Sequence, residues 1–124
     1  MNNSINSVAV LGSGTMGAGI AALCLEKGLK VLLLDITEEA VMKGKKIISD
    51  EKNKMLSNKD FLSNLETGVF YQDFSKIKDF DWICEAVVEN VKIKREIFIK
   101  IEEYRKDGSI VSSNTSGIPL RDIV

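Results

Sequence analysis

The residues best suited to chemistry stand where a short apolar run meets a glycine-rich segment. Residues 7–11 are mostly apolar, and a helix-like stretch and a second apolar run follow, the second run ending in Asp35. This order of strand, glycine turn, helix, strand and acid is typical of a dinucleotide-binding βαβ unit. The turn reads G-x-G-x-x-G and consists of Gly12, Ser13, Gly14, Thr15, Met16 and Gly17.

Each part of this motif has a physical role. Gly12 permits a tight turn, Gly14 lets a pyrophosphate approach the backbone, and Gly17 lets the helix pack close to the strands. The helix N-terminus presents N–H groups and a partial positive charge to the phosphates. Asp35 can accept hydrogen bonds from the adenosine ribose and would repel a 2′-phosphate, so the sequence predicts NAD rather than NADP. A glycine-rich turn without a ligand explains neither Gly17 nor Asp35.

Composition narrows the class of protein. A chain of 124 residues makes one domain, spanning residues 1–124, and its net charge of −1 gives no reason to expect a nucleic-acid partner. The apolar runs are too short to span a membrane, and the polar N-terminus lacks a signal pattern, so we expect a cytoplasmic protein. The chain has no histidine, and Cys24 and Cys84 are isolated, which predicts two buried thiols and no metal site.

Hydrophobic spacing predicts the elements that carry the motif. A first helix is expected over residues 16–27, with its apolar face formed by Met16, Ile20, Leu23 and Cys24. After a strand over 31–34, Thr37 is expected to cap a second helix that runs to about residue 55. Its lysines could meet an anionic ligand or form a solvated face, and the second interpretation is favoured.

The second half continues the alternation of strands and helices. We expect a helical turn over 59–65, strands over 69–71, 82–87 and 109–112, and a short helical turn over 73–80. An amphipathic helix over 91–105 would face inward with Ile97, Phe98, Ile101 and Tyr104. The pattern predicts the α/β class, with a doubly wound parallel sheet of the Rossmann type.

Polar residues follow the later strands as well. Because ligands bind outside the carboxyl ends of parallel strands, residues 12–17, Asp35, 85–90 and 113–116 are expected to share one surface. Glu89 could accept a hydrogen bond from a ribose hydroxyl, and Lys94 could donate to a ribose or phosphate oxygen. The alternative is an acid near a helix start and an exposed helical lysine. Residues 112–116 could likewise form only a loop and a helix cap.

Three stretches together carry a family resemblance. Residues 8–21 (VAVLGSGTMGAGIA), 85–94 (EAVVENVKIK) and 113–116 (SNTS) resemble, in this order, three signatures of the L-3-hydroxyacyl-CoA dehydrogenase family. That family oxidises (S)-3-hydroxyacyl-CoA to 3-oxoacyl-CoA with NAD, in fatty-acid β-oxidation and related pathways. The resemblance extends over nearly the whole chain from residue 6 and is weakest between about 50 and 75.

The resemblance implies roles for individual residues. Residues 12–17 would hold the pyrophosphate and Asp35 the adenosine ribose. Glu89 and Lys94 match family residues near the nicotinamide half of the cofactor. Ser116 matches a catalytic serine that contacts both the substrate oxygen and the cofactor, and Asn114 lies in the same motif and would line the pocket.

The family's general base is a histidine beyond the SNTS motif, and this chain contains none. We therefore expect an N-terminal piece of the NAD-binding domain, with a Rossmann-type fold incomplete at its C-terminus and no activity by itself. The full-length enzyme would act on acyl-CoA as a homodimer through a C-terminal helical domain. Two alternatives remain open: another NAD-dependent hydroxy-acid dehydrogenase, or a non-catalytic Rossmann module that binds a nucleotide.

Overall fold

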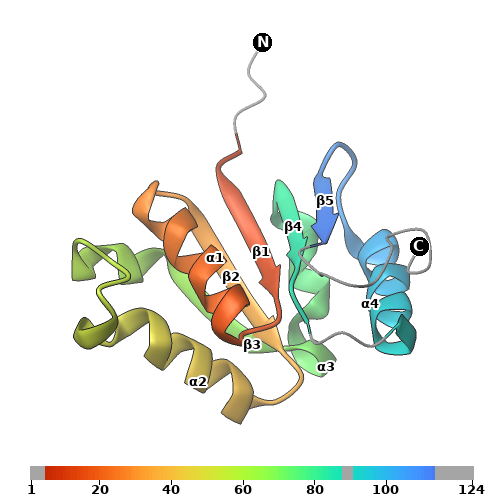
Figure 1. The fold of residues 1–124 in the computed structure, drawn as a ribbon. Coiled ribbons are helices and arrows are strands. Elements are labelled where there is room, and N and C mark those ends of the chain that lie inside the picture. Colours follow the sequence, from red (N-terminus) through yellow and green to blue (C-terminus); the bar gives the residue numbers. More distant parts are fainter. Residues whose placement is uncertain (1–4, 88–90, 114–124) are drawn as a thin grey trace.

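Five parallel strands form one sheet in the order β3-β2-β1-β4-β5 (Figure 1). The computed structural model describes residues 5–87 and 91–113. The order reverses direction between β1 and β4, as the doubly wound class requires, which confirms the predicted fold. The strands are β1 (Ser7–Leu11), β2 (Lys30–Asp35), β3 (Leu65–Val69), β4 (Trp82–Glu85) and β5 (Ile110–Ser113).

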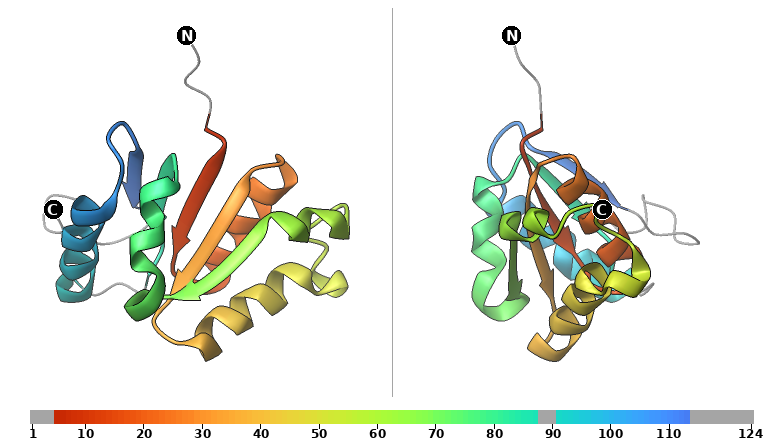
Figure 2. Two further views of the ribbon diagram at one scale, coloured as in Figure 1. Left: turned by 180° about the vertical axis from the view of Figure 1, so that it is seen from behind. Right: turned by 90° about the vertical axis from the view of Figure 1, so that its left-hand side faces the viewer.

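Helices cover both faces of the sheet (Figure 2). One face is packed by α1 and α2, and the other by α3, a following 3₁₀ helix and α4. The elements are α1 (Thr15–Glu26), α2 (Glu38–Ser49), α3 (Phe70–Asp73), η3 (Phe74–Asp79) and α4 (Val91–Tyr104), with the 3₁₀ helices η1 (Glu51–Asn53) and η2 (Lys59–Asn64) after α2.

The position of β1 between two layers of helices explains why its sequence is continuously apolar. In β1, Val8 and Val10 pack into the core beneath α1 and α2, whereas Ala9 and Leu11 pack into the core beneath α4. Parallel strands that are buried on both faces need apolar side chains at every position. The neighbouring β2 follows the same rule, with Val31 and Leu33 on one side and Leu32 and Leu34 on the other.

The predicted strand over 69–71 is wrong. Strand β3 ends at Val69, and the next residues form α3. The carboxylate of Asp73 accepts a hydrogen bond from the backbone N–H of Val69 at 2.9 Å, which turns the chain into a helix one residue later. The second helix also ends earlier than expected, at Ser49, because Asp50 is extended and its side chain accepts from Lys52 N as η1 begins.

The predicted apolar face of α1 is partly wrong. Met16 is 51% exposed and Leu23 is 61% exposed, whereas the helix rests on the sheet through Ala18, Ala21 and Leu25. Small residues let a helix lie close to a sheet, so they take the inner face from the larger side chains. In α4 the expected Ile97, Phe98 and Ile101 are buried, but Tyr104 is 37% exposed and packs its ring against Phe74 at 6.2 Å.

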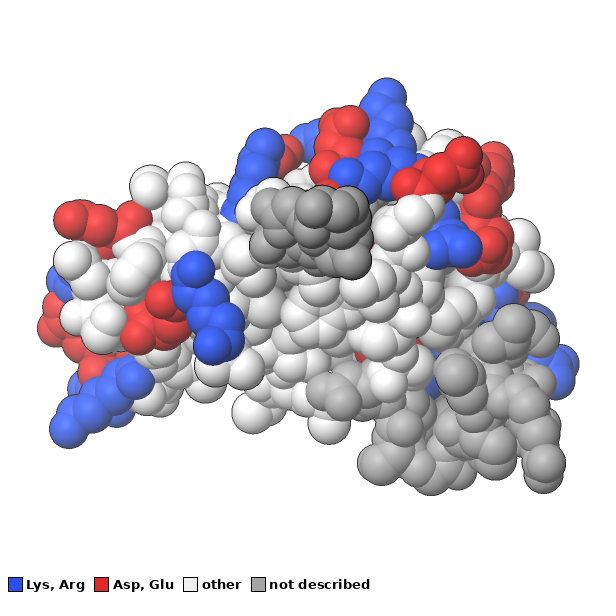
Figure 3. Space-filling view, turned by 90° about the horizontal axis from the view of Figure 1, so that it is seen from above, with Lys and Arg blue, Asp and Glu red and all other residues white. Residues whose placement is uncertain are grey.

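Both cysteines are buried and free, as the sequence predicted. Burial raises the pKa of the Cys24 thiol and of the Cys84 thiol, so both act as small apolar side chains at neutral pH. Seen from the amino ends of the strands, acidic and basic side chains are mixed along the left, upper and right margins of the surface (Figure 3). No helix among the described residues is long and apolar enough to cross a membrane.

Candidate functional site

The glycine-rich loop lies at the carboxyl end of β1, where the strand order reverses. Its first residue donates from Gly12 N to Leu34 O at 2.7 Å, and the adjacent Leu11 O accepts from Ala86 N at 2.7 Å. The loop is therefore fixed to the strands on both sides, β2 and β4. In open α/β sheets this switch point is where a dinucleotide binds.

Two of the three motif glycines are required by packing within the chain. Gly12 has a φ of +112°, and a Cβ built on it would lie 2.6 Å from the backbone carbonyl of Ala86. A Cβ on Gly17 would overlap the carbonyl oxygen of Gly12. These two glycines hold the turn against β4 and the helix against the turn, in agreement with the roles predicted for them.

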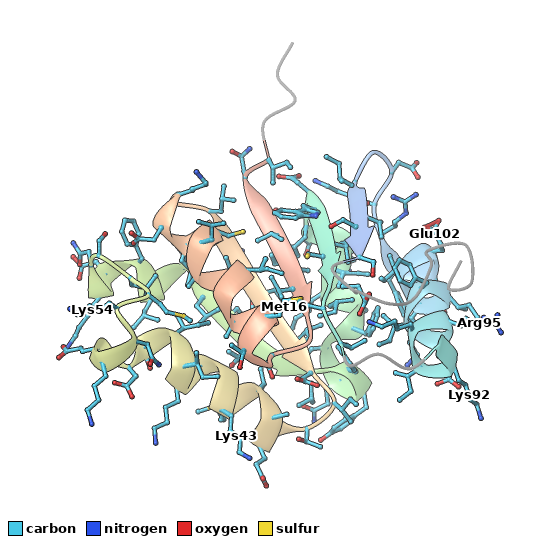
Figure 4. The ribbon with its side chains drawn as sticks, viewed as in Figure 1. Met16, Lys43, Lys54, Lys92, Arg95 and Glu102 are labelled. Carbon is cyan, nitrogen blue, oxygen red and sulfur yellow. The ribbon has the colours of Figure 1, made fainter. Side chains whose placement is uncertain are left out.

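Gly14 is different, because no described atom lies within 4 Å of the position of a Cβ on this residue. It is exposed, as are Thr15 and Met16 in the first turn of α1, and Figure 4 labels Met16 on this helix. This helix has no capping side chain and no acid in its first turn. An anion outside the chain fits this position, since a glycine there leaves the backbone N–H groups accessible and the helix dipole favours negative charge.

Asp35 is held beside this loop by Ser13. Its Oδ2 accepts from Ser13 N at 2.8 Å and from Ser13 Oγ at 2.5 Å, and its Oδ1 accepts from Ile36 N at 2.7 Å. A carboxylate has about four lone-pair sites, so Asp35 keeps acceptor capacity for a ribose hydroxyl. Asp35 is partly exposed beside the loop, so its remaining lone pairs could accept from a hydroxyl of the adenosine ribose of NAD, and the residues present fit that cofactor.

Ser13 also connects the loop to the second helix, which the sequence did not indicate. Its side chain is almost completely buried, and its hydroxyl lies 2.8 Å from Ala40 O as well as near Asp35. A Cβ on Gly44 would lie 2.5 Å from Ser13 O, so α2 can approach the loop only because residue 44 is glycine. The signal available in the sequence was this glycine within a helical pattern, which favours a close approach.

A second polar group is formed by Glu85 and Lys94. Lys94 Nζ lies 2.5 Å from Glu85 Oε2 and donates to Val87 O at 2.7 Å, and both side chains are fully buried. The interpretation of Lys94 as an exposed lysine is therefore wrong. The other oxygen of the carboxylate, Oε1, accepts from Ser113 Oγ at 2.6 Å.

Glu85 lies within the predicted surface of residues 85–90, but the sequence indicated no role of its own for it. It pairs with Leu11 in the sheet register and so stands directly beside the glycine-rich loop. A carboxylate at the end of an otherwise apolar strand was the available signal, because such a residue is almost never fully buried unless it is paired.

The structure brings residues 12–17, Asp35 and Lys94 to the carboxyl edge of the sheet. The other predicted site residues, Glu89, Asn114 and Ser116, lie outside the described residues. Among residues 5–87 and 91–113, no group of three or more acidic or cysteine side chains could hold a metal ion.

Comparison with known proteins gives a consistent result. Residues 7–124 match the family model described as "3-hydroxyacyl-CoA dehydrogenase, NAD binding domain". A probable 3-hydroxyacyl-CoA dehydrogenase of Bacillus subtilis is 41% identical over 99% of this chain and 18% of its own length. The mitochondrial hydroxyacyl-coenzyme A dehydrogenase of Homo sapiens is 33% identical over 96% of this chain and 41% of its own length.

Solved structures agree with the sequence comparisons. An (S)-3-hydroxybutyryl-CoA dehydrogenase from Ralstonia eutropha superposes with a TM-score of 0.84 at 31% identity, over 97% of this chain and 44% of that one. A 3-hydroxybutyryl-CoA dehydrogenase from Escherichia coli gives a TM-score of 0.81 at 30% identity, over 97% of this chain and 26% of that one. The chain thus spans less than half the length of these relatives.

Proposed function

The chain belongs to the 3-hydroxyacyl-CoA dehydrogenase family through its NAD-binding domain, and we propose that it serves the oxidation of (S)-3-hydroxyacyl-CoA to 3-oxoacyl-CoA in fatty-acid metabolism. The relatives named for 3-hydroxyacyl-CoA or 3-hydroxybutyryl-CoA substrates support this substrate class. Since the chain spans less than half of those relatives, the reaction is assigned to a larger protein or assembly that contains this domain.

One observation carries the proposal: the acceptor Asp35 and the accessible Gly14 are joined through Ser13 at the strand switch point. Residues 12–17 would hold the pyrophosphate at the N-terminus of α1, and Asp35 would hold the adenosine ribose. Bound NAD supplies a hydride acceptor. A carboxylate at position 35 would also repel the 2′-phosphate of NADP, which supports a preference for NAD.

The second half of the sheet would take the nicotinamide end and the substrate. We assign Glu89, Lys94 and Asn114 to this half, and Ser116 to the placement of the substrate oxygen beside the nicotinamide. The chain contains no histidine, so the base that removes the hydroxyl proton would have to come from outside it. We accordingly propose that the chain alone does not turn over substrate, and that Ser116→Ala in the larger protein lowers kcat more than it weakens NAD binding.

The first test measures binding of NAD and NADP to the chain by NMR titration, before and after Asp35→Ala. We expect NAD to be preferred and the preference to disappear in the variant. Equal discrimination in both proteins would remove Asp35 from the cofactor site.

The second test addresses the reaction. The larger protein should reduce NAD in the presence of (S)-3-hydroxybutyryl-CoA, and not with free 3-hydroxy acids or sugar acids. A preference for a hydroxy acid that is not bound to coenzyme A would favour another NAD-dependent dehydrogenase. NAD binding without any turnover would favour a non-catalytic module. Light scattering and cell fractionation of the same protein would test the proposed homodimer and the proposed cytoplasmic location.

A further inference from the structure

The polar group at the carboxyl ends of β4 and β5 is centred on one side chain, Glu85. We propose that Glu85 is a positioning residue which, through Lys94, presets the backbone at the end of β4 for the nicotinamide half of the cofactor. This inference rests on the proposed assignment of that half of the sheet. It concerns a residue that touches the protein itself rather than the reacting atoms.

Three elements of the fold meet at the Glu85 carboxylate. Oε2 accepts from the backbone N–H of Val87 at 2.7 Å and pairs with Lys94 Nζ at 2.5 Å. Oε1 accepts from Ser113 Oγ at 2.6 Å. The end of β4, the first turn of α4 and the end of β5 are thus joined by one side chain.

Lys94 adds a second contact with the backbone of Val87. Its ammonium also donates to Val87 O at 2.7 Å, so the N–H and the carbonyl of the same residue are both held by the buried pair. Because these two groups lie on either side of the Val87 Cα, holding both restrains the φ and ψ angles of Val87. The chain just beyond β4 therefore leaves the sheet in a direction set by two charged side chains that no solvent reaches.

The pair of Glu85 and Lys94 lies beside the glycine-rich loop. Ala86, between Glu85 and Val87, donates to Leu11 O at 2.7 Å, and its carbonyl is the atom that excludes a side chain from Gly12. Asp35 lies on the opposite side of the loop, at the end of β2. Because the adenosine half belongs to β1 and β2, the half built on β4 and β5 is left for the nicotinamide.

Burying this pair of charges has an energetic cost. A buried ion pair does not stabilise a fold by itself, since desolvation cancels much of the attraction. An apolar pair of similar size would serve the core equally well. The charged pair holds the backbone of Val87 and the hydroxyl of Ser113, which an apolar pair could not do. This gives the pair a purpose beyond packing.

The experiment compares two double variants of the 124-residue chain. Glu85→Gln with Lys94→Met removes both buried charges together, so neither is left uncompensated. The matched control is Asp81→Asn with Lys106→Met, which removes a 2.5 Å ion pair at the amino end of the same strand. NMR titrations measure the dissociation constants of NAD and of ADP, which contains only the adenosine half.

We expect wild type and control to bind NAD more tightly than ADP. The Glu85 and Lys94 double variant should bind ADP as wild type does. The ratio of its dissociation constant for ADP to that for NAD should fall toward one. Hydrogen exchange of the Val87 amide, measured without ligand, should accelerate in this variant only. Together these results would separate positioning from general loss of structure, which would weaken both ligands.

Two outcomes overturn different claims. If wild type binds both ligands and the double variant keeps the full NAD advantage, or loses both affinities equally, the positioning role of Glu85 is refuted and the proposed function stands. If wild type binds neither NAD nor ADP, the proposed function is refuted and this inference with it. A variant that does not fold would be replaced by Ser113→Ala, for which the same change in the ratio, smaller in size, is expected, and whose unchanged ratio would refute the inference.

Discussion

The hydroxyl of Ser13 lies 2.5 Å from Oδ2 of Asp35, and the backbone N–H of the same serine donates to the same oxygen at 2.8 Å. The acid at the end of β2 and the loop at the end of β1 are therefore one unit before any cofactor is present. In the sequence they stand apart, each as a separate motif position. Their contact explains how the proposed ribose acceptor and the proposed phosphate-binding backbone keep a fixed separation.

Ser13→Ala should loosen this unit without breaking it, because the backbone bond to Asp35 remains. We expect a loss of about 1 kcal/mol in the free energy of unfolding, weaker NAD binding and a smaller preference over NADP. Urea denaturation and NMR titration provide the two measurements. Ser57→Ala is a matched control, since Ser57 donates from N and Oγ to one oxygen of Glu26, at 3.0 Å each, away from the loop. Equal binding losses in both variants would argue against a special role for Ser13.

The three motif glycines should respond differently to a side chain. Gly14→Val should keep the fold, at a cost of about 1 kcal/mol for a poorer helix cap, and abolish NAD binding by occupying the phosphate position. Gly17→Val should fail to fold stably, because its Cβ would overlap the carbonyl of Gly12. Circular dichroism and titration distinguish the two results. NAD binding by a folded Gly14→Val chain would place the pyrophosphate elsewhere.

Lys94→Met should be among the most destabilising single changes, since it leaves the Glu85 carboxylate buried without its partner. Breaking a buried pair in this way costs roughly 3–5 kcal/mol. By comparison, Lys106→Met removes a partly exposed pair with Asp81 and should cost no more than about 1 kcal/mol. Urea denaturation of both variants tests the contrast. Similar small losses would mean that Lys94 is not essential to the buried network.

Asp73 should make the chain sensitive to acid. The hydrogen bond from Val69 N, aided by Lys76, holds the pKa of this carboxyl below its ordinary value of 3.8. The folded state therefore binds a proton less readily than the unfolded state, so the stabilisation is complete above pH 3.8 and is lost as the pH falls below it. Asp73→Asn should flatten this part of the curve of unfolding free energy against pH. The exposed Asp79→Asn serves as control, and an unchanged slope in Asp73→Asn would refute the assignment.

Much of the fold could be predicted from the alternation of apolar runs and helical patterns. The errors arose where a side-chain contact with the backbone, or the small size of the inner residues of a helix, decided the local structure. Asp73 accepts a hydrogen bond from Val69 N as a helix begins at residue 70, although a strand is predicted over residues 69–71. Leu23 is exposed because small alanines bring α1 close to the sheet. The first effect depends on a hydrogen bond that hydrophobic spacing does not indicate, whereas the second was available in the helical spacing of Ala18, Ala21 and Leu25.

The candidate site divides in the same way. Local motifs predicted the turn and the acid, since glycines and a strand-end carboxylate have defined roles in a βαβ unit. The burial of Lys94 could not be predicted, because its partner Glu85 is on another element and the two meet only when α4 packs on β4. The link from Ser13 to α2 was missed for the same reason.

The Ser13 contact also limits how this domain could be redesigned for NADP. Replacing Asp35 with a neutral apolar residue would remove the charge that opposes a 2′-phosphate, but it would also leave the backbone N–H of Ser13 without its acceptor, while the Ser13 hydroxyl would keep only Ala40 O. A larger residue at Gly44 could not fill the gap from the α2 side, since Ser13 already occupies that space. A change of cofactor would therefore require positions 13, 35 and 44 to be altered together.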